Sequence, residues 1–360
     1  MQPLFGSAAV VVCHPKPGDG ASFEALTLND ARRVVVFGAG ATGARVARQL
    51  RSSGRVDCVE IRDPDAAAAS RLIDSLGDGA ELGVGREVDG SVAAVVIASP
   101  GGTQTVLARR AIHAGVPVIT TSNKTAEVRR LLSLDQEARF RHLSVIVGAG
   151  FMPGLTCLLA KHGAHQFDEV EEIHVAKVGT GGPACARQHH RALSSRGVDW
   201  RDGRWAERTG GSGRELAWFP DPVGGRDCYR AGLPDALLLV PEFAGVQRVT
   251  ARQAATRRDR LTSPLPMLRR PHPEGGIGAI RVELRGRVGL ERRVAVFGAI
   301  ERPAVGAGAM AAAVTLHVLD GLMAPGAYGL AGVDDSAGLL RTLASRGVKP
   351  VRFEGMSTFV

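Results

Sequence analysis

The chain has 360 residues, 44% of them hydrophobic and 22% charged, a composition that is ordinary for a globular protein with room for two domains. Its apolar runs are too short or too rich in small residues for a membrane span of ~20 residues, so we expect none. The net charge of +9 comes from arginines spread along the chain, and only 4% of the residues are aromatic. We therefore expect no nucleic-acid partner and interpret the charge as steering an anionic cofactor or a small anionic substrate.

Residues 1–30 predict an N-terminal extension or a peripheral strand. A short apolar run at 8–12 has no basic stretch before it, and Pro15 and Pro17 follow it, which is unlike a signal peptide. The five cysteines are scattered, odd in number and without C-x-x-C spacing. Such usage is typical of the reducing cytoplasm, where we expect this protein to be located.

Three glycines with the spacing G-x-G-x-x-G follow the apolar run 33–37 and open a helical pattern at 44–53. Gly38 permits the tight turn off the strand, Gly40 lets the backbone approach a pyrophosphate, and Gly43 lets the helix pack closely on the strand. A strand before the glycines and a helix after them are the context that this fingerprint requires. The stretch therefore predicts a dinucleotide-binding site.

The start of that helix and the end of the next strand, 56–61, complete the predicted cofactor contacts. Free N–H groups at Ala41 and Thr42 are expected to hold the diphosphate. An NAD enzyme usually carries an acid about 20 residues past the glycines, and here Arg62 and then Asp63 stand at that place. A guanidinium beside the ribose suits a 2′-phosphate, which favours NADP, while Asp63 leaves NAD open. Asp63, followed by proline, is also a good helix N-cap.

Strands and helices then alternate, which predicts a parallel, doubly wound sheet covered on both faces. The expected strands are 80–84, 91–97, 117–120 and 143–147, and the expected helices are 63–77, 103–114 and one within 125–142. Ser99 and Pro100 follow the strand at 91–97, at the switch point of the sheet, where backbone normally borders the cofactor.

The pattern changes near residue 167, where a half-exposed, alternating strand begins. A polar region follows at 179–235, and strand-like segments at 236–240, 278–284 and 293–297 predict an antiparallel sheet. An alanine-rich helix opens at Pro303, and a helix at 336–345 and a strand at 348–353 close the chain. We divide it into residues 1–30, a Rossmann domain at 31–165, an inserted α+β domain at 166–300 and a returning segment at 301–360.

Groups for acid–base chemistry and substrate binding are concentrated in the polar region, since loops rich in functional side chains are where binding groups gather. The candidate general acids are His189 or His190, with Tyr229 next, and the candidate carboxylate anchors are Arg191, Arg230 and Arg258. For each of these residues, a surface position or a structural hydrogen bond is the alternative. Cys185 with the two histidines lacks a second pair at zinc spacing, so no metal is predicted.

Two stretches resemble the saccharopine dehydrogenase-like family of NAD(P)-dependent oxidoreductases. They are Val-Val-Val-Phe-Gly-Ala-Gly-Ala-Thr-Gly at 34–43 and Val-Ile-Val-Gly-Ala-Gly-Phe-Met-Pro-Gly-Leu at 145–155. The resemblance implies a Rossmann domain, an inserted domain that binds substrate and pairs in a homodimer, and a nicotinamide near Gly150 and Phe151. Without that resemblance, Phe151 is a core residue in a tight turn.

The resemblance implies a nicotinamide cofactor and hydride transfer, and it does not fix the substrate. We expect the hydride transfer to take place at a C–N bond of an amine- or amino-acid-derived substrate. Three alternatives stay open: reduction of a C=C or C=O bond in a lipid or ketide, binding of NADP(H) without turnover, and a homospermidine-synthase-like transfer that recycles bound NAD.

Overall fold

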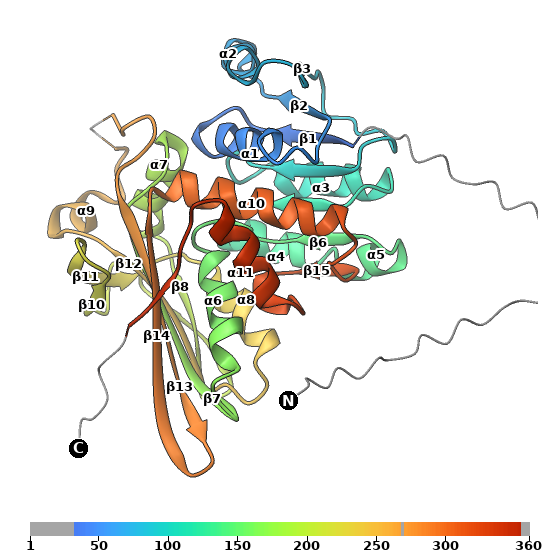
Figure 1. The fold of residues 1–360 in the computed structure, drawn as a ribbon. Coiled ribbons are helices and arrows are strands. Elements are labelled where there is room, and N and C mark those ends of the chain that lie inside the picture. The colour runs from blue at the N-terminus through green and yellow to red at the C-terminus, as the bar shows by residue number, and fades with distance from the viewer. Residues whose placement is uncertain (1–31, 268–269, 354–360) are drawn as a thin grey trace, which may run out of the picture. The chain divides into compact units, whose positions relative to one another are not determined.

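The computed structural model describes residues 32–267 and 270–353 (Figure 1). The predicted N-terminal extension, residues 1–30, lies outside the described residues. Within those residues, no helix is both long and apolar enough to cross a membrane.

The first sheet consists entirely of parallel strands. They are β1 (Arg33–Phe37), β2 (Cys58–Arg62), β3 (Ala80–Leu82), β4 (Ala94–Ile97), β5 (Val118–Thr120), β6 (Ser144–Ile146) and β15 (Gly326–Tyr328). Their order is β15-β6-β5-β4-β1-β2-β3. This is the doubly wound order, with the strand order reversing between β1 and β4 and with β15 added beside β6. The predicted Rossmann-type α/β fold is confirmed.

Helices connect and cover these strands. They are α1 (Ala41–Arg51), α2 (Ala66–Leu76), α3 (Gln104–His113), α4 (Thr125–Leu132), α5 (Asp135–Phe140), α6 (Leu155–Ala164), α10 (Pro303–Leu319) and α11 (Ser336–Ser345). The alanine-rich α10 begins at Pro303, as expected, and runs along α1 (Figure 1). The two helices approach so closely that a Cβ atom on Gly308 would lie 2.4 Å from the Cβ of Arg45.

The second sheet is mixed rather than antiparallel. Its strands are β7 (Glu169–Val178), β8 (Gly197–Arg201), β9 (Arg204–Arg208), β10 (Glu215–Phe219), β11 (Gly224–Arg230), β12 (Arg248–Ala254), β13 (Gly278–Val288), β14 (Glu291–Glu301) and β16 (Val351–Arg352). The main order is β10-β11-β12-β7-β13-β14-β16, with β8 paired to β12 and β9 to β8. The expectation of an antiparallel sheet is wrong at its centre, where β12 pairs with β7 in parallel.

Three local expectations are corrected. The apolar run at 236–240 is not a strand, because it forms the buried helix α8 (Asp235–Leu239) and enters a 3₁₀ turn at Val240–Glu242. Two helices, α4 and α5, replace one within 125–142. The N-cap of α2 is Asp65 and not Asp63, since the Asp65 side chain accepts from the N–H of Ala68. The remaining helices are α7 (Pro183–Ala192), α9 (Arg257–Thr262) and a 3₁₀ turn at Leu330–Gly332.

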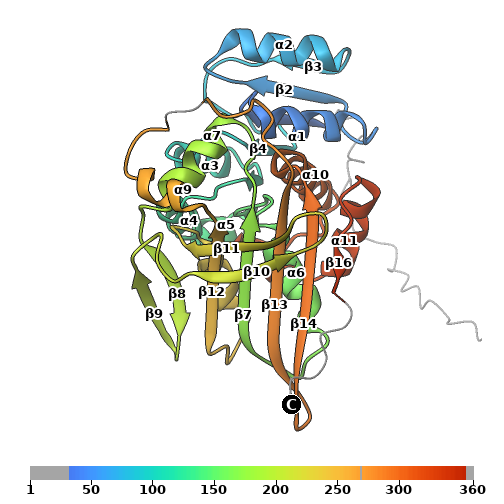
Figure 2. The ribbon, with the colours of Figure 1, turned by 90° about the vertical axis from the view of Figure 1, so that its left-hand side faces the viewer.

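The two faces of the second sheet differ. One face, here called the inner face, carries Ile173, Val175 and Leu284 into the same core as the first sheet and α6. The hairpin of β10 and β11 crosses the opposite, outer face, where Ala176 and Phe219 belong to a small separate core (Figure 2). A functional group on the inner face therefore points toward the Rossmann half of the chain.

Candidate functional site

The turn from β1 into α1 has the geometry of an anion cradle. Gly38 adopts a φ of +116°, and a Cβ on Gly43 would lie 1.8 Å from the carbonyl oxygen of Gly38. A Cβ on Gly40, by contrast, would meet nothing within 4 Å, so this glycine borders open space. Helix α1 has no side-chain cap and no acidic residue in its first turn, which leaves the N–H groups of Ala41 and Thr42 for a negatively charged group.

Arg62 and Asp63, at the end of β2, lie in different surroundings. The Arg62 side chain is buried: Nε lies 2.5 Å from Glu60 Oε1, the guanidinium carbon lies 5.5 Å from the centre of the Phe37 ring, and NH1 donates to the carbonyl of Glu87. Asp63 is half-buried, and its Oδ2 accepts from the N–H of Ala39 at 2.7 Å. The carboxylate of Asp63, rather than the guanidinium of Arg62, therefore adjoins the glycine turn.

Unpartnered hydroxyl groups follow the carboxyl ends of β4 and β5. The Oγ atoms of Ser99 and Ser122 are buried and have no hydrogen-bond partner among the described residues. The backbone at Ser99 is held by Gln104, whose Nε2 donates to the Ser99 carbonyl at 2.5 Å. Pro100, the next residue, is exposed at the same edge. This edge belongs to the switch point, where ligands of doubly wound folds bind.

The crossover from β6 to α6 is a tight turn. The N–H of Gly150 donates to the carbonyl of Gly148 at 2.8 Å and lies 3.1 Å from the carbonyl of Pro153. Phe151 is buried against α10, where a Cβ on Gly306 would lie 2.7 Å from its ring. Gly150 thus lies at the carboxyl edge of the sheet, whereas Phe151 has a packing role.

A row of polar side chains crosses the inner face of the second sheet. Tyr229 on β11 is paired with Gln253 on β12, and Gln253 is paired with Lys177 on β7. All three are buried, with Lys177 only 6% exposed. Paired residues of neighbouring strands share a face, so the three side chains form one line, here called the polar row.

His189 on α7 covers this row. Its ring Nε2 lies 3.3 Å from the carbonyl oxygen of Ala254, and its own carbonyl accepts from Gln253 Nε2 at 2.8 Å. Burial, together with the charge of Lys177, lowers the pKa of His189 to about 3. The imidazole is therefore neutral and donates through Nε2, while its buried Nδ1 has no partner among the described residues.

Asp235, the first residue of α8, lies beside the row. It is fully buried, and its Oδ1 accepts from the hydroxyl of Thr156 on α6 at 2.7 Å. Burial raises the pKa of Asp235 to about 6, although the Thr156 hydrogen bond and the charge of Lys177 act in the opposite direction. Its Oδ2 has no partner within the described structure. A buried carboxyl group with a raised pKa, on which the charge of a buried lysine acts, is a combination suited to proton transfer.

The loop after β7 joins the polar row to the glycine turn. A Cβ on Gly182, the N-cap of α7, would lie 2.7 Å from the Cβ of Ala41, and one on Gly181 would lie 3.3 Å from the Cβ of Ala304. The N-termini of α1, α7 and α10 therefore meet, and Figure 1 shows these three helix ends near one another. The carboxyl end of β7, which bears Lys177, lies on the side of the sheet where the glycine turn is found.

The other predicted residues lie elsewhere. His190 Nε2 is 2.9 Å from the carbonyl of Thr262, which holds a loop in place. Arg230 is ion-paired with Asp199 at 3.3 Å, and Arg191 and Arg258 are exposed. Of the six residues predicted for catalysis and substrate binding, the structure brings only His189 and Tyr229 to the polar row.

Lys177, Gln253, Asp235 and Arg260 were not predicted. The guanidinium carbon of Arg260 lies 4.3 Å from the centre of the Tyr229 ring, and its Nε donates to the carbonyl of Gly211 at 2.7 Å. A signal for Lys177 was present in the sequence, because a lysine continues the apolar alternation of 173 and 175 on the buried face of a strand. Asp235 and Gln253 had no comparable signal.

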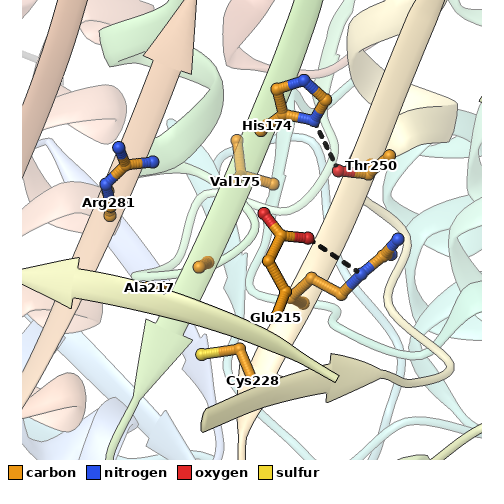
Figure 3. Close-up of a pocket in the computed structure, with 9 residues that line it drawn as sticks. His174, Val175, Glu215, Ala217, Cys228, Thr250 and Arg281 are labelled. Carbon is orange, nitrogen blue, oxygen red and sulfur yellow. Dashed lines mark hydrogen bonds and ion pairs between the residues drawn. The ribbon is translucent and has the colours of Figure 1, made fainter. Parts of the chain in front are cut away.

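A second group of charged residues lies under the β10–β11 hairpin, on the outer face (Figure 3). It encloses a cavity of about 10 Å³, which is room for one water molecule. His174 Nδ1 lies 2.8 Å from Thr250 Oγ1, and Arg252 Nε lies 3.8 Å from Glu215 Oε2. These charges are paired and are separated from the polar row by the sheet, so we assign them a structural role.

No protein-family model matches this sequence. The fold is similar to that of apo saccharopine dehydrogenase (L-Glu forming) from Saccharomyces cerevisiae, which is 13% identical, with a TM-score of 0.67 over 89% of this chain and 100% of that one. It is more distantly similar to C. glutamicum DAP dehydrogenase in complex with DAP, at 13% identity and a TM-score of 0.46 over 88% and 99% of the two chains. GenD2 from gentamicin A biosynthesis, in complex with NAD, has 18% identity and a TM-score of 0.44 over 90% and 97%. The first match shows that this chain has the saccharopine dehydrogenase fold, which confirms the resemblance at the level of the fold.

Proposed function

We propose that the protein is a nicotinamide-dinucleotide-dependent oxidoreductase whose substrate binds over the polar row. The supporting observation is the glycine turn at the switch point, with open space at Gly40, joined through the Gly181–Gly182 loop to a buried set of acid–base groups. The residues present fit such a cofactor: Gly40, Ala41 and Thr42 would hold the diphosphate, and Ser99 and Gly150 would border the nicotinamide. The chemistry that the cofactor supplies when bound is hydride transfer.

We propose NAD(H) as the preferred cofactor, in place of the NADP favoured by the sequence. The reason is that Glu60 and the Glu87 carbonyl already engage the Arg62 guanidinium, while the carboxylate of Asp63 stands at the end of β2 beside the turn. An acid at this place accepts hydrogen bonds from ribose hydroxyls and repels a 2′-phosphate. NADP(H) is the alternative that the binding experiment below distinguishes.

For the substrate we propose a small, anionic amine or amino acid that is interconverted with its imine. The reaction class comes from the fold shared with saccharopine dehydrogenase, and the buried row offers polar partners of the required kinds. Tyr229 and Gln253 can bind substrate polar atoms, and the unpartnered Nδ1 of His189 can accept a hydrogen bond. Arg260 is better placed than Arg191, Arg230 or Arg258 to bind an anionic group, because Tyr229 orients its guanidinium. A homodimer formed through the second sheet is part of this proposal.

The first test is a fluorescence titration of the protein with NADH and with NADPH. We expect NADH to bind more tightly, and Asp63→Ala to weaken NADH binding about tenfold while NADPH binding is unchanged or improved, since one charged hydrogen bond to ribose is worth about 1.5 kcal/mol. The matched control is Asp65→Ala, which removes the α2 cap and lowers stability by about 1 kcal/mol without affecting nucleotide binding. Failure of both nucleotides to bind would contradict the proposed function. Binding without NADH oxidation by any 2-oxo acid and amine pair would favour a sensor.

A further inference from the structure

We propose that Lys177 is the catalytic residue that exchanges a proton with the substrate, and that Asp235, positioned by Thr156, is the counter-charge that makes this exchange possible. The inference rests on the proposed function and assigns the acid–base role within the same site.

The place of Lys177 supports this role. It stands on β7, at the end of the polar row opposite Tyr229 and one residue from the end of the strand, and its side chain is 6% exposed. A buried lysine is costly unless it is paired or functional. No hydrogen bond or ion pair holds its ammonium group among the described residues, in contrast to the paired charges of the outer face. Its ammonium protons are therefore free to meet a ligand.

His189 cannot take the role of proton donor in this arrangement. Its one ring N–H points to the carbonyl of Ala254, and the remaining nitrogen, Nδ1, is an acceptor. The lowered pKa of about 3 keeps the ring neutral near pH 7. Tyr229 is fixed beneath the guanidinium of Arg260 at the far end of the row. Lys177 is the member of the row that carries a transferable proton and precedes the Gly181–Gly182 loop, which approaches the glycine turn at Ala41.

The charge of Lys177 acts on Asp235, although the two side chains form no ion pair among the described residues. Thr156 holds one carboxylate oxygen, so the other, Oδ2, is left without a partner and must be offset by a nearby charge. The groups that act on Asp235 are Lys177 from β7 and Thr156 from α6, while Cys157 on α6 is itself affected by its charge. His189 responds to Lys177 and to Asp259 from α9. Loss of the lysine proton would leave Asp235 without its counter-charge, which favours rapid reprotonation.

The proposed step is balanced in the direction of imine reduction. The imine carbon receives the hydride, whereby the C=N double bond becomes a single bond and NADH becomes NAD⁺. The imine nitrogen receives a proton from the ammonium group of Lys177. The neutral amine of Lys177 regains a proton from water, and the oxidative direction reverses each transfer.

The chain has only five lysines, which makes a direct test practical. Protein labelled with [¹³Cε]lysine gives few NMR signals, and the Lys177 signal is assigned by its loss in Lys177→Met. We expect this signal to shift with a step near pH 6, which reports the ionisation of Asp235. The step should be absent in Asp235→Asn, which keeps the size of the side chain. It should persist in Glu283→Gln, the control, since Glu283 is also buried and lies on β13, next to β7, but on the outer face.

NADH is then added as the probe. We expect NADH to move the Lys177 signal and to leave that of Lys161, in the last turn of α6, unchanged. A step that persists in Asp235→Asn, or NADH binding without a response at Lys177, would overturn this inference and leave the proposed function intact. Absence of NADH binding, seen in the fluorescence of the same sample, would overturn the proposed function, and the catalytic role of Lys177 with it.

Discussion

Gly40 and Gly43 are three residues apart, but a methyl group added at each would meet different surroundings. At Gly43 it would overlap the carbonyl oxygen of Gly38 at 1.8 Å, so Gly43→Ala is expected to lower the free energy of unfolding by about 3 kcal/mol. At Gly40 it would enter open space, so Gly40→Ala should keep stability within about 0.5 kcal/mol. Urea unfolding measures both effects.

The same two substitutions distinguish an effect on packing from an effect on NADH binding. Gly40→Ala should weaken NADH binding at least tenfold, because the new methyl group occupies the space that the diphosphate needs. The Gly40→Ala protein, which stays folded, therefore tests NADH binding. Gly43→Ala tests the packing of α1 on the turn. Wild-type NADH affinity in Gly40→Ala would show that the diphosphate does not lie at this turn.

Asp235 makes the stability of the protein depend on pH. Its folded-state pKa of about 6 lies above the ordinary value of 3.8, so the unfolded chain releases this proton first as pH rises. Asp235 makes its full contribution to the free energy of unfolding below about pH 4. This contribution is lost as the pH rises through 6, which lowers the free energy of unfolding by about 3 kcal/mol. Asp235→Asn removes this loss.

We therefore expect Asp235→Asn to gain stability relative to the wild type between pH 4.5 and pH 7, as measured by urea unfolding at both values. The lowered pKa of His189 makes the free energy of unfolding depend on pH in the opposite direction. The contribution of His189 is complete above pH 6.5 and is lost on acidification. Both proteins contain His189, so its effect cancels in the comparison. A difference that stays constant across this range would contradict the assignment of a raised pKa to Asp235.

The contact between α1 and α10 depends on one missing side chain. An alanine inside a helix is normally favoured over glycine by about 1 kcal/mol, but a Cβ on Gly308 would lie 2.4 Å from the Cβ of Arg45. We expect Gly308→Ala to destabilise the protein by about 2 kcal/mol, since overpacking outweighs helix propensity. A double-mutant cycle with Arg45→Gly tests the cause, because removal of the opposing Cβ should restore part of the loss. Additive effects of the two substitutions on the free energy of unfolding would show that the destabilisation does not come from the contact between residues 308 and 45.

At the level of elements, the sequence was sufficient to predict those helices and strands that are determined by neighbouring residues. Continuous apolar strands, the glycine spacing and Pro303 at a helix start predicted β1 to β6 and α10, because each depends on neighbouring residues. The seventh strand of the first sheet, β15, was not predicted. The run at 236–240 was misjudged because five apolar residues suit a short strand or a buried helical turn equally well. The parallel pairing of β12 with β7 could not be predicted, since the two strands are about 70 residues apart and strand periodicity carries no information on partner or direction.

The residues of the candidate site show the same difference between local and long-range information. His189 and Tyr229 were predicted because titratable groups stand out in a polar region, and the structure places both at the polar row, where their roles stay predictions. Asp235 was missed because it precedes an apolar segment and acquires its role only when α8 meets Thr156 on α6. Lys177 belongs to the strand pattern, and only the pairing of three strands shows that it lies in one row with Gln253 and Tyr229.

On the scale of the whole described chain, both sheets share one hydrophobic core, which includes Val36 from β1, Leu158 from α6 and Leu284 from β13. Because α6 leaves the first sheet and packs on the second, neither sheet can unfold without exposing the other. We expect one calorimetric transition with equal van't Hoff and calorimetric enthalpies, shifted as a whole by NADH, which at 100 times its Kd adds about 2.7 kcal/mol. Two transitions, with only one of them sensitive to NADH, would contradict a shared core.

Within residues 32–353, the last two strands lie at the edges of the two sheets, β15 beside β6 and β16 beside β14. During synthesis, one edge of β6 therefore stays unpaired until β15 has been made, about 180 residues later. At 5–20 residues per second this interval is about 10–35 seconds, during which β6 presents an unpaired edge. Ribosome-bound chains that stop before Gly326 should accordingly bind chaperones or aggregate, since unpaired strand edges are templates for association.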